Sequence, residues 1–186
     1  MNTTQLTGIV LCGGQSFRMG SDKGLVAYKD KTLVEYAINS ISGYCSDIIL
    51  STNRELYRKF GYKLVADYHN HIGPLGGIFS GLSTSINDQC LITACDIPFI
   101  DKGILDLMMD KATQTKIVLL KLAKGYFQPF PAILAKNVLP VIEKQIDSGN
   151  HKLQDLYADL EQRMQNDVSI IEIEAEPLNI NTKNDF

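Results

Sequence analysis

The sequence predicts an α/β fold in which a mostly parallel central sheet lies between two layers of helices, a three-layer α/β/α arrangement. Short apolar runs typical of buried strands alternate along the chain with stretches of helical period. The chain has 186 residues, of which 45% are hydrophobic, and no repeat, low-complexity tract or Pro/Ser-rich linker divides it. We therefore expect a single domain, 1–186, built on one core.

Seven segments are expected to form strands, because each is a short and mostly apolar run and strands inside a parallel sheet are buried on both faces. They are 7–12, 47–51, 63–66, 90–94, 116–121, 131–134 and 168–173. Between the first two, Leu33, Ala37 and Ile41 recur at helical spacing and form a stripe that would cover the sheet. The helices predicted in this way are 31–42, 75–85, 101–112, 136–148 and 152–161.

Composition excludes several classes of protein. The net charge of −3 and the pI near 5.6 provide no overall positive charge for binding nucleic acid or an anionic membrane. The first residues carry no secretory signal pattern, and no apolar run approaches the roughly 18 residues of a membrane span. No C-x-x-C pair occurs, so we expect reduced thiols in a cytoplasmic protein at Cys12, Cys45, Cys90 and Cys95.

The first predicted strand leads into a long loop, 11–24, that contains four glycines and two cations. Gly13 and Gly14 lack a Cβ atom, so their backbone can approach a triphosphate closely and direct N–H groups at its oxygens. Arg18 can form paired hydrogen bonds with phosphate, and Lys23 can place a point charge beside it. A merely flexible connection is the alternative, but most strand-to-helix loops have only about 2 to 6 residues.

This loop matches neither a G-x-x-x-x-G-K-[ST] phosphate loop, since Ser21 follows Gly20, nor a G-x-G-x-x-G dinucleotide motif. It resembles the signature L-x-G-G-x-S-x-R-M-G-x-D-K of the molybdenum cofactor guanylyltransferases, a family with a Rossmann-like nucleotidyltransferase fold. Every fixed position is met, by Leu11, Gly13, Gly14, Ser16, Arg18, Met19, Gly20, Asp22 and Lys23. The resemblance implies that Arg18 and Lys23 act in catalysis. It also implies that the nucleotide is bound by Lys23 and by the segment Leu11, Cys12, Gly13 and Gly14.

Asp96 follows the apolar run 90–94, so its carboxylate should project from the carboxyl end of a strand, where ligands of open α/β sheets bind. Mg²⁺ is often held by one or two carboxylates together with substrate phosphate oxygens and water. Taken alone, an aspartate at this position is more often a turn or cap residue. The segment Cys95-Asp-Ile-Pro-Phe99 resembles the family motif C-D-x-P-F, which implies that Asp96 acts in catalysis, binds the nucleotide and is the ligand of an Mg²⁺ cofactor.

Two further segments resemble the nucleotide pocket of the family. The segment 67–77 is rich in glycine, and the resemblance implies that Asp67 and Gly76 line the pocket. Asn53 follows the second predicted strand, and the resemblance assigns it to guanine, whose edge suits an amide that both donates and accepts. A turn-forming role for Asn53 remains the alternative.

Residues after about 125 are expected to bind the acceptor, whereas the preceding part binds the nucleoside triphosphate. Gln128 begins a segment similar to the family's Q-P-x-x-A stretch, and Asn179 and Asn181 belong to a segment similar to N-x-N-T-P-E-D. The resemblance therefore implies that Gln128, Asn179 and Asn181 face the acceptor. Lys183 replaces the usual proline, and 149–153 lacks the arginines common in the family.

The resemblance implies transfer of GMP from GTP to the terminal phosphate of molybdopterin, with or without bound molybdenum, and release of pyrophosphate. The resemblance also allows transient contacts with two kinds of protein partner, molybdenum-insertion proteins and apo-molybdoenzymes. Two enzymes of the same fold remain as alternatives, a molybdopterin cytidylyltransferase and a sugar-1-phosphate nucleotidyltransferase. A nucleotide-binding regulatory module without catalysis is the alternative from another class of protein.

Overall fold

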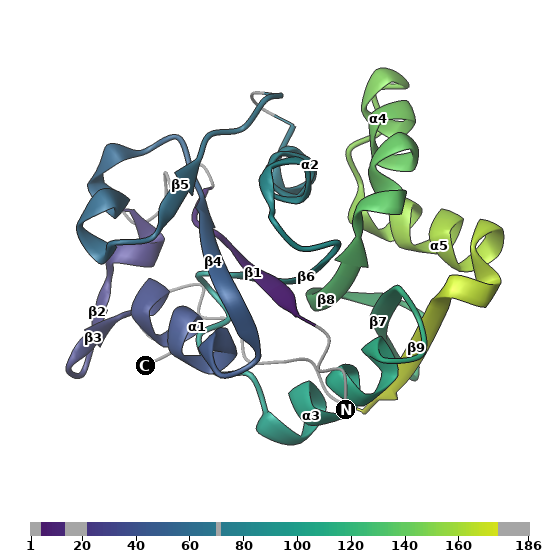
Figure 1. Ribbon diagram of the computed structural model, residues 1–186, viewed down its shortest axis with the longest axis horizontal. Coiled ribbons are helices and arrows are strands. Elements are labelled where there is room, and N and C mark those ends of the chain that lie inside the picture. The colour runs from purple at the N-terminus through teal and green to yellow at the C-terminus, as the bar shows by residue number, and fades with distance from the viewer. Residues whose placement is uncertain (1–4, 14–21, 70–71, 175–186) are drawn as a thin grey trace.

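The computed structural model describes residues 5–13, 22–69 and 72–174. Its centre is a seven-stranded sheet with the strand order β5-β4-β1-β6-β8-β7-β9 (Figure 1). The strands are β1 Leu6–Leu11, β4 Cys45–Ser51, β5 Lys63–Val65, β6 Gln89–Ala94, β7 Ile117–Leu122, β8 Phe127–Ala135 and β9 Val168–Ile173. In this sheet β8 runs antiparallel to β6 and β7, and the other neighbours are parallel. The predicted fold class is confirmed.

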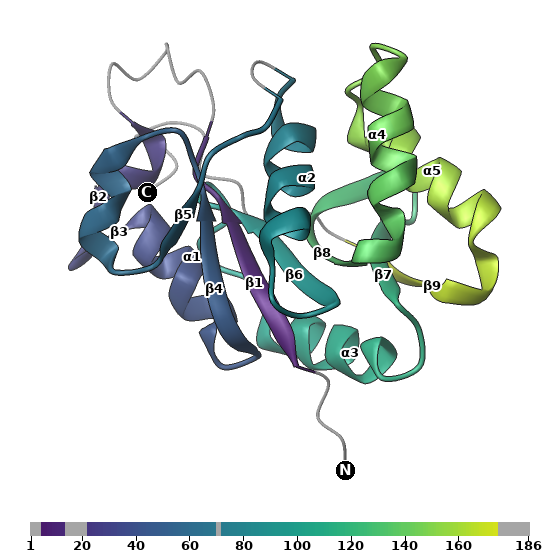
Figure 2. The same cartoon turned by 45° about the horizontal axis from the view of Figure 1, so that its top comes forward.

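Helices cover both faces of the sheet, with α1 and α3 on one side and α2 and α4 on the other (Figure 1 and Figure 2). On β1, Gly8 lies against Ile41 of α1, whereas the next residue, Ile9, lies against Gly81 of α2. This alternation is expected of a strand buried on both faces. The helices are α1 Leu33–Ser42, α2 Pro74–Thr84, α3 Lys102–Ala112, α4 Leu139–Asp147 and α5 Leu153–Arg163.

The start of α1 is fixed by its local sequence. The carboxylate of Glu35 accepts hydrogen bonds from the backbone N–H and the hydroxyl of Thr32, at 2.8 and 2.6 Å. This interaction between Thr32 and Glu35 caps the helix at its N-terminus. It provides an acceptor for the backbone N–H of Thr32, which has no partner within the helix. Just before it, β2 (Ala27–Tyr28) and β3 (Lys31–Thr32) form a short antiparallel hairpin that the sequence did not predict.

Strand β8 is longer than its predicted segment, 131–134, because it begins at Phe127. Pro129 and Pro131 lie inside it and lack the N–H that a ladder requires. The pairing of β8 with β7 contains a register shift, and β8 pairs with β6 only from Ala132 onward. The two prolines therefore lie where β8 needs no regular ladder, which allows the strand to pass near the middle of the sheet.

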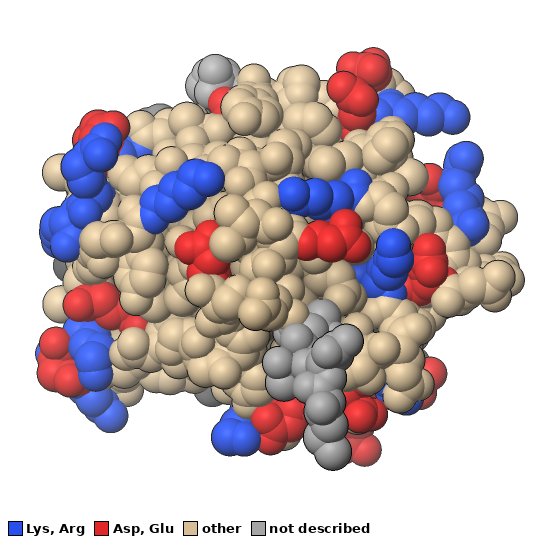
Figure 3. Space-filling view, in the orientation of Figure 1, with Lys and Arg blue, Asp and Glu red and all other residues tan. Residues whose placement is uncertain are grey.

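Acidic and basic side chains are interspersed on the face shown in Figure 3, where no large patch of one sign is visible. Within the part of the chain that the structure describes, none of the helices has the length and apolar character that crossing a bilayer requires. The four cysteines are free thiols, of which Cys12, Cys90 and Cys95 are buried and Cys45 is half-buried.

Candidate functional site

A cavity of about 730 Å³ opens at the carboxyl ends of β1, β4 and β6. This is the edge where parallel strands of open α/β sheets place their ligands. Its lining comes from several stretches of the described chain and one residue of β8: Leu11, Cys12, Gly13, Asp22, Lys23, Ser51, Thr52, Asn53, Arg54, Asp67, Gly73, Pro74, Gly77, Ala94, Cys95, Asp96 and Phe130.

Backbone hydrogen bonds continue the sheet into the floor of the cavity. The N–H of Cys12 donates to the carbonyl of Ser51 at 2.9 Å, and the N–H of Cys95 donates to the carbonyl of Leu11 at 3.0 Å. These bonds hold the ends of β1, β4 and β6 together one residue beyond the regular strands. Gly13 and Asp96, the next residues on their strands, are thereby brought to the same edge.

Lys23 and Asp96 meet inside the cavity. Lys23 begins the short 3₁₀ helix η1 (Lys23–Leu25), and its Nζ atom lies 3.0 Å from Oδ2 of Asp96. The two side chains are 16% and 31% exposed, and both residues line the cavity. The arrangement places one cation and one carboxylate in the cavity, and a cation of this kind can bind a phosphate group.

The side chains of the cavity fit a magnesium site in which the protein supplies one carboxylate and a bound phosphate group supplies further ligands. Among residues 5–13, 22–69 and 72–174, no three His, Cys, Asp or Glu side chains gather in a way that could hold a metal. Asp96 presents a partly exposed carboxylate beside Lys23. Because Mg²⁺ is commonly bound by one carboxylate, water and substrate phosphate oxygens, Asp96 is a sufficient protein ligand for such a site.

Asn53 and Asp67 lie together on the cavity wall. The Oδ1 atom of Asn53 accepts a hydrogen bond from the backbone N–H of Asp67 at 2.9 Å, which ties the end of β4 to the end of β5. The hydroxyl of Ser51 donates to Oδ1 of Asp67 at 3.4 Å. Burial raises the pKa of Asp67, and the hydrogen bond from Ser51 opposes that shift.

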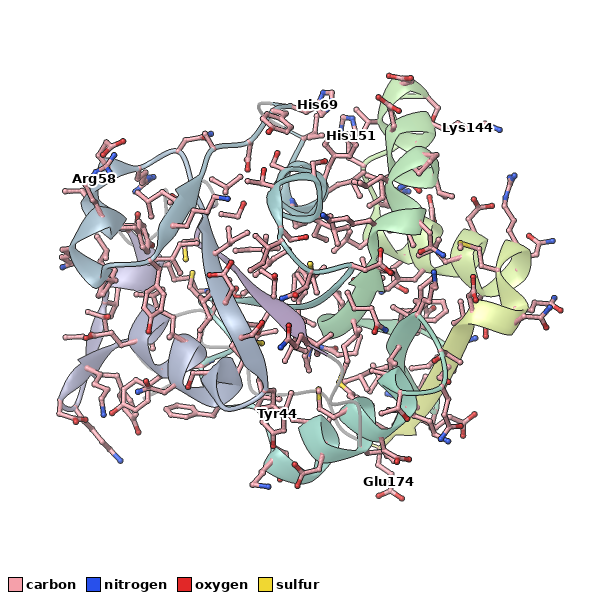
Figure 4. All side chains as sticks on the ribbon, in the orientation of Figure 1. Tyr44, Arg58, His69, Lys144, His151 and Glu174 are labelled. Atoms are coloured by element: carbon pink, nitrogen blue, oxygen red, sulfur yellow. The ribbon has the colours of Figure 1, made fainter. Side chains whose placement is uncertain are left out.

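The glycines of α2 differ in what they contact. Gly77 lines the cavity, and a Cβ atom there would lie 2.7 Å from Oγ of Ser51. Gly76, which the sequence assigned to the pocket, does not line it, and a Cβ atom there would lie 2.8 Å from the carbonyl oxygen of His69. Gly76 thus allows the preceding loop, where Figure 4 labels His69, to pack closely on α2.

Gln128 also lies away from the cavity surface. Its side chain is buried, and Nε2 donates to the carbonyl of Phe130 at 3.1 Å. Phe130 itself lines the cavity, so Gln128 supports a residue of the wall instead of forming the wall. The remaining predicted site residues, Gly14, Arg18, Asn179 and Asn181, lie outside the described residues.

Asp22 and Arg54 are cavity residues that the sequence did not single out as a site. Their ion pair is 2.8 Å long, and the two positions are too far apart in the chain for spacing to predict it. Cys12 also lines the cavity, where burial, followed by contact with Cys95, raises the pKa of its thiol. The cavity therefore offers charged and backbone groups that can bind phosphate, and burial disfavours ionisation of the Cys12 thiol.

The chain is similar in sequence and in fold to several known proteins. Residues 8–165 match the family described as the MobA-like NTP transferase domain. A "Probable molybdenum cofactor guanylyltransferase" of Flavobacterium johnsoniae is 35% identical over 153 residues, which are 82% of this chain and 80% of the relative. The molybdenum cofactor guanylyltransferase of Pseudomonas entomophila is 31% identical over 150 residues, 78% of each chain. The solved molybdopterin-guanine dinucleotide biosynthesis protein A of Archaeoglobus fulgidus superimposes with a TM-score of 0.75 at 21% identity, over 97% of this chain and 94% of that one.

Proposed function

The chain belongs to the family of MobA-like NTP transferases, and from that membership we propose that it transfers GMP from GTP to the terminal phosphate of molybdopterin, releasing pyrophosphate. Relatives that carry the name molybdenum cofactor guanylyltransferase support this choice of substrates. The observation that carries the proposal is the meeting of Lys23 and Asp96 at 3.0 Å in the cavity. A nucleoside triphosphate in that cavity would bring its phosphates to both residues.

The reaction needs no deprotonated side chain as a nucleophile. The terminal phosphate of the acceptor is already an anion near neutral pH, and one of its oxygens attacks the α-phosphorus of GTP. A new P–O bond forms as the bond between the α-phosphorus and the bridging oxygen of pyrophosphate breaks, and the electron pair leaves with pyrophosphate. The protein then has two tasks, to align the reactants and to neutralise charge.

The residues of the cavity divide these tasks among them. Lys23, which lines the cavity, would hold its ammonium group beside the phosphates, where negative charge grows on the leaving group. The backbone N–H of Gly13, which lies just beyond the carboxyl end of β1, would contact the phosphates. Asn53 and Asp67 would line the nucleoside. We expect Arg18, Gly14, Asn179 and Asn181 to contribute as the sequence predicts.

We propose Mg²⁺ as the cofactor, with Asp96 as its protein ligand. The ion supplies additional positive charge to the triphosphate when it is bound. EDTA should abolish transfer, and added Mg²⁺ should restore it. Asp96→Asn should require a higher Mg²⁺ concentration for half-maximal rate than the parent protein does. Transfer that continues in excess EDTA would contradict this part of the proposal.

The halves of the chain are proposed to have different roles. Strands β1, β4, β5 and β6 surround the nucleotide side of the cavity, whereas β8 contributes Phe130 to the side on which we place the acceptor. We also propose a cytoplasmic location, because GTP is a cytoplasmic substrate and the four cysteines are free thiols.

The deciding experiment supplies the purified protein with molybdopterin, Mg²⁺ and one nucleotide at a time, GTP, CTP, UTP or ATP. Mass spectrometry detects the dinucleotide product, and a coupled assay measures pyrophosphate. We expect a product from GTP only. A product from CTP only would make the protein a cytidylyltransferase on the same fold. No pyrophosphate with molybdopterin or with sugar 1-phosphates would favour a regulatory nucleotide-binding module.

A further inference from the structure

The Asp22 carboxylate uses both of its oxygens. Oδ1 accepts hydrogen bonds from the backbone N–H of Gly24 at 3.2 Å and from the hydroxyl of Tyr57 at 2.5 Å. Oδ2 lies 2.8 Å from Nη1 of Arg54. The side chain of Asp22 is only 11% exposed, whereas that of Arg54 is 48% exposed. Asp22 is therefore held from inside the protein by Tyr57 and from the cavity side by Arg54.

Tyr57 is the fixed end of this arrangement. It lies in the 3₁₀ helix η2 (Glu55–Phe60), which follows β4, and its side chain is fully buried. Burial raises the pKa of Tyr57, so its hydroxyl stays protonated and remains a donor. A buried hydroxyl that donates to a carboxylate is costly to displace, because either group would lose its partner away from water.

The same contacts fix the position of the segment that carries Lys23. Asp22 is the N-cap of η1, since its side chain accepts from the N–H of Gly24. A Cβ atom on Gly24 would overlap the hydroxyl of Tyr57 and would lie 3.2 Å from Sγ of Cys95. Lys23 thus sits between two residues whose positions are set by contacts with buried groups.

We propose that Asp22 is a positioning residue which, anchored by Tyr57 and Arg54, fixes the backbone of η1 so that Lys23 reaches Asp96. The inference rests on the proposed function, because the effect of positioning Lys23 is measured as a rate of GMP transfer. It assigns to Asp22, Tyr57 and Arg54 a role that acts through Lys23 and requires none of them to touch the reacting atoms.

The sharpest test is Tyr57→Phe, which removes one hydroxyl and keeps the buried ring. We expect kcat to fall about tenfold to a hundredfold, because catalysis is sensitive to misplacement of a reacting group by about 1 Å. The KM for GTP should change less. Tyr44→Phe is the matched control, since Tyr44 also donates to an aspartate, Asp106, at 2.7 Å. Figure 4 shows Tyr44 on the side of the molecule opposite His69.

A double-mutant cycle identifies the residue through which Tyr57 acts. In a Lys23→Ala background, Tyr57→Phe should produce no further loss of kcat, because the group that it positions is absent. Losses that multiply would overturn the inference, as would equal kcat values for Tyr57→Phe and Tyr44→Phe.

If Tyr57→Phe does not fold, Asp22→Asn replaces it. Asparagine keeps an acceptor for Gly24 and Tyr57 and should retain more activity than Asp22→Ala, and equal loss in both variants would overturn the inference.

A crystal structure of Tyr57→Phe separates failure of this inference from failure of the proposed function. Loss of the contact between Lys23 and Asp96 in that structure supports the positioning role even if the parent protein transfers no GMP. An unchanged contact in the variant overturns the role even if the parent protein is active.

Discussion

The Nζ atom of Lys23 lies 3.0 Å from Oδ2 of Asp96, which joins η1 to the carboxyl end of β6. The two residues are 73 positions apart in the chain, yet both line the cavity. A cation and a carboxylate thus lie together in the cavity. Preorganised charges of this kind stabilise a transition state without first having to reorganise.

Removing either partner of this pair should slow transfer. We expect Lys23→Ala or Asp96→Ala to lower kcat by on the order of 10²-fold or more, with the melting temperature little changed. Lys102→Ala is the control, because Lys102 pairs at 2.7 Å with Asp106 on the exposed surface of α3. Steady-state kinetics of the three variants provide the measurement. Full activity in Lys23→Ala or Asp96→Ala would contradict their roles.

Nucleotide binding should be visible as a change in stability. A ligand at 100 times its Kd stabilises the native state by about 2.7 kcal/mol. We expect GTP with Mg²⁺ to raise the melting temperature, and CTP, UTP and ATP at the same concentration to raise it much less. A rise with CTP alone would point to cytosine as the preferred base.

Gly77→Ala should weaken nucleotide binding. The added Cβ would lie 2.7 Å from Oγ of Ser51 and 3.0 Å from a methyl group of Leu11, so the cavity wall must shift. Gly81→Ala is the matched control, because its Cβ would lie 2.8 Å from Ile9, away from the cavity lining. Overpacking should destabilise both variants by about 1–3 kcal/mol. Titration calorimetry with GTP should show weaker affinity only for Gly77→Ala, and equal affinities would disprove the role of this wall.

Asp67→Asn should change how stability depends on pH. Burial raises the pKa of Asp67 above its ordinary value of 3.8, so the folded state binds a proton more readily than the unfolded state. Its contribution to the free energy of unfolding is therefore present below pH 3.8 and is lost as the pH rises through the folded pKa. At pH 7 we expect Asp67→Asn to be more stable than the parent protein, with the difference shrinking toward pH 3.8.

Asp106→Asn provides a control of opposite sign for that experiment. Hydrogen bonds from Lys102 and Tyr44 lower the pKa of Asp106, so its stabilisation is present above 3.8 and is lost as the pH falls through the folded pKa. Urea denaturation across this pH range measures both variants. If Asp67→Asn and Asp106→Asn changed the pH dependence of stability in the same direction, the raised pKa of Asp67 would be refuted.

The sequence predicted the parts of the fold that depend on local pattern. Each predicted strand is present because apolar runs are long enough to be buried. The helix predicted from residue 31 begins instead at Leu33, because Thr32 and Glu35 form a cap that the predicted bounds did not take into account. The hairpin of β2 and β3 was missed, because strands of two residues have no period to detect. The full length of β8 was missed because two prolines usually exclude a strand.

The site was predicted where a motif placed residues at strand ends, and it was missed where packing decides. Lys23 and Asp96 were expected to share one crevice, and the structure brings them together. The contacts of Asp22 with Arg54 and Tyr57 span 32 and 35 positions, and no motif specifies the partners. Gly76 was chosen from its motif, but only the helix geometry shows that Gly77, and not Gly76, lines the cavity.

The reversed direction of β8 has a consequence for how the chain folds. Strands β7 and β8 are antiparallel neighbours joined by a tight turn, in which Leu122 donates to the carbonyl of Tyr126 at 2.8 Å. The pairing of β1 with β6, in contrast, joins Leu6 to Gln89, and closing so long a loop costs more conformational entropy. We expect amides of β7 and β8 to gain protection first in pulsed hydrogen exchange during refolding. Earlier protection of β1 would show that the nucleotide half of the sheet nucleates the fold instead.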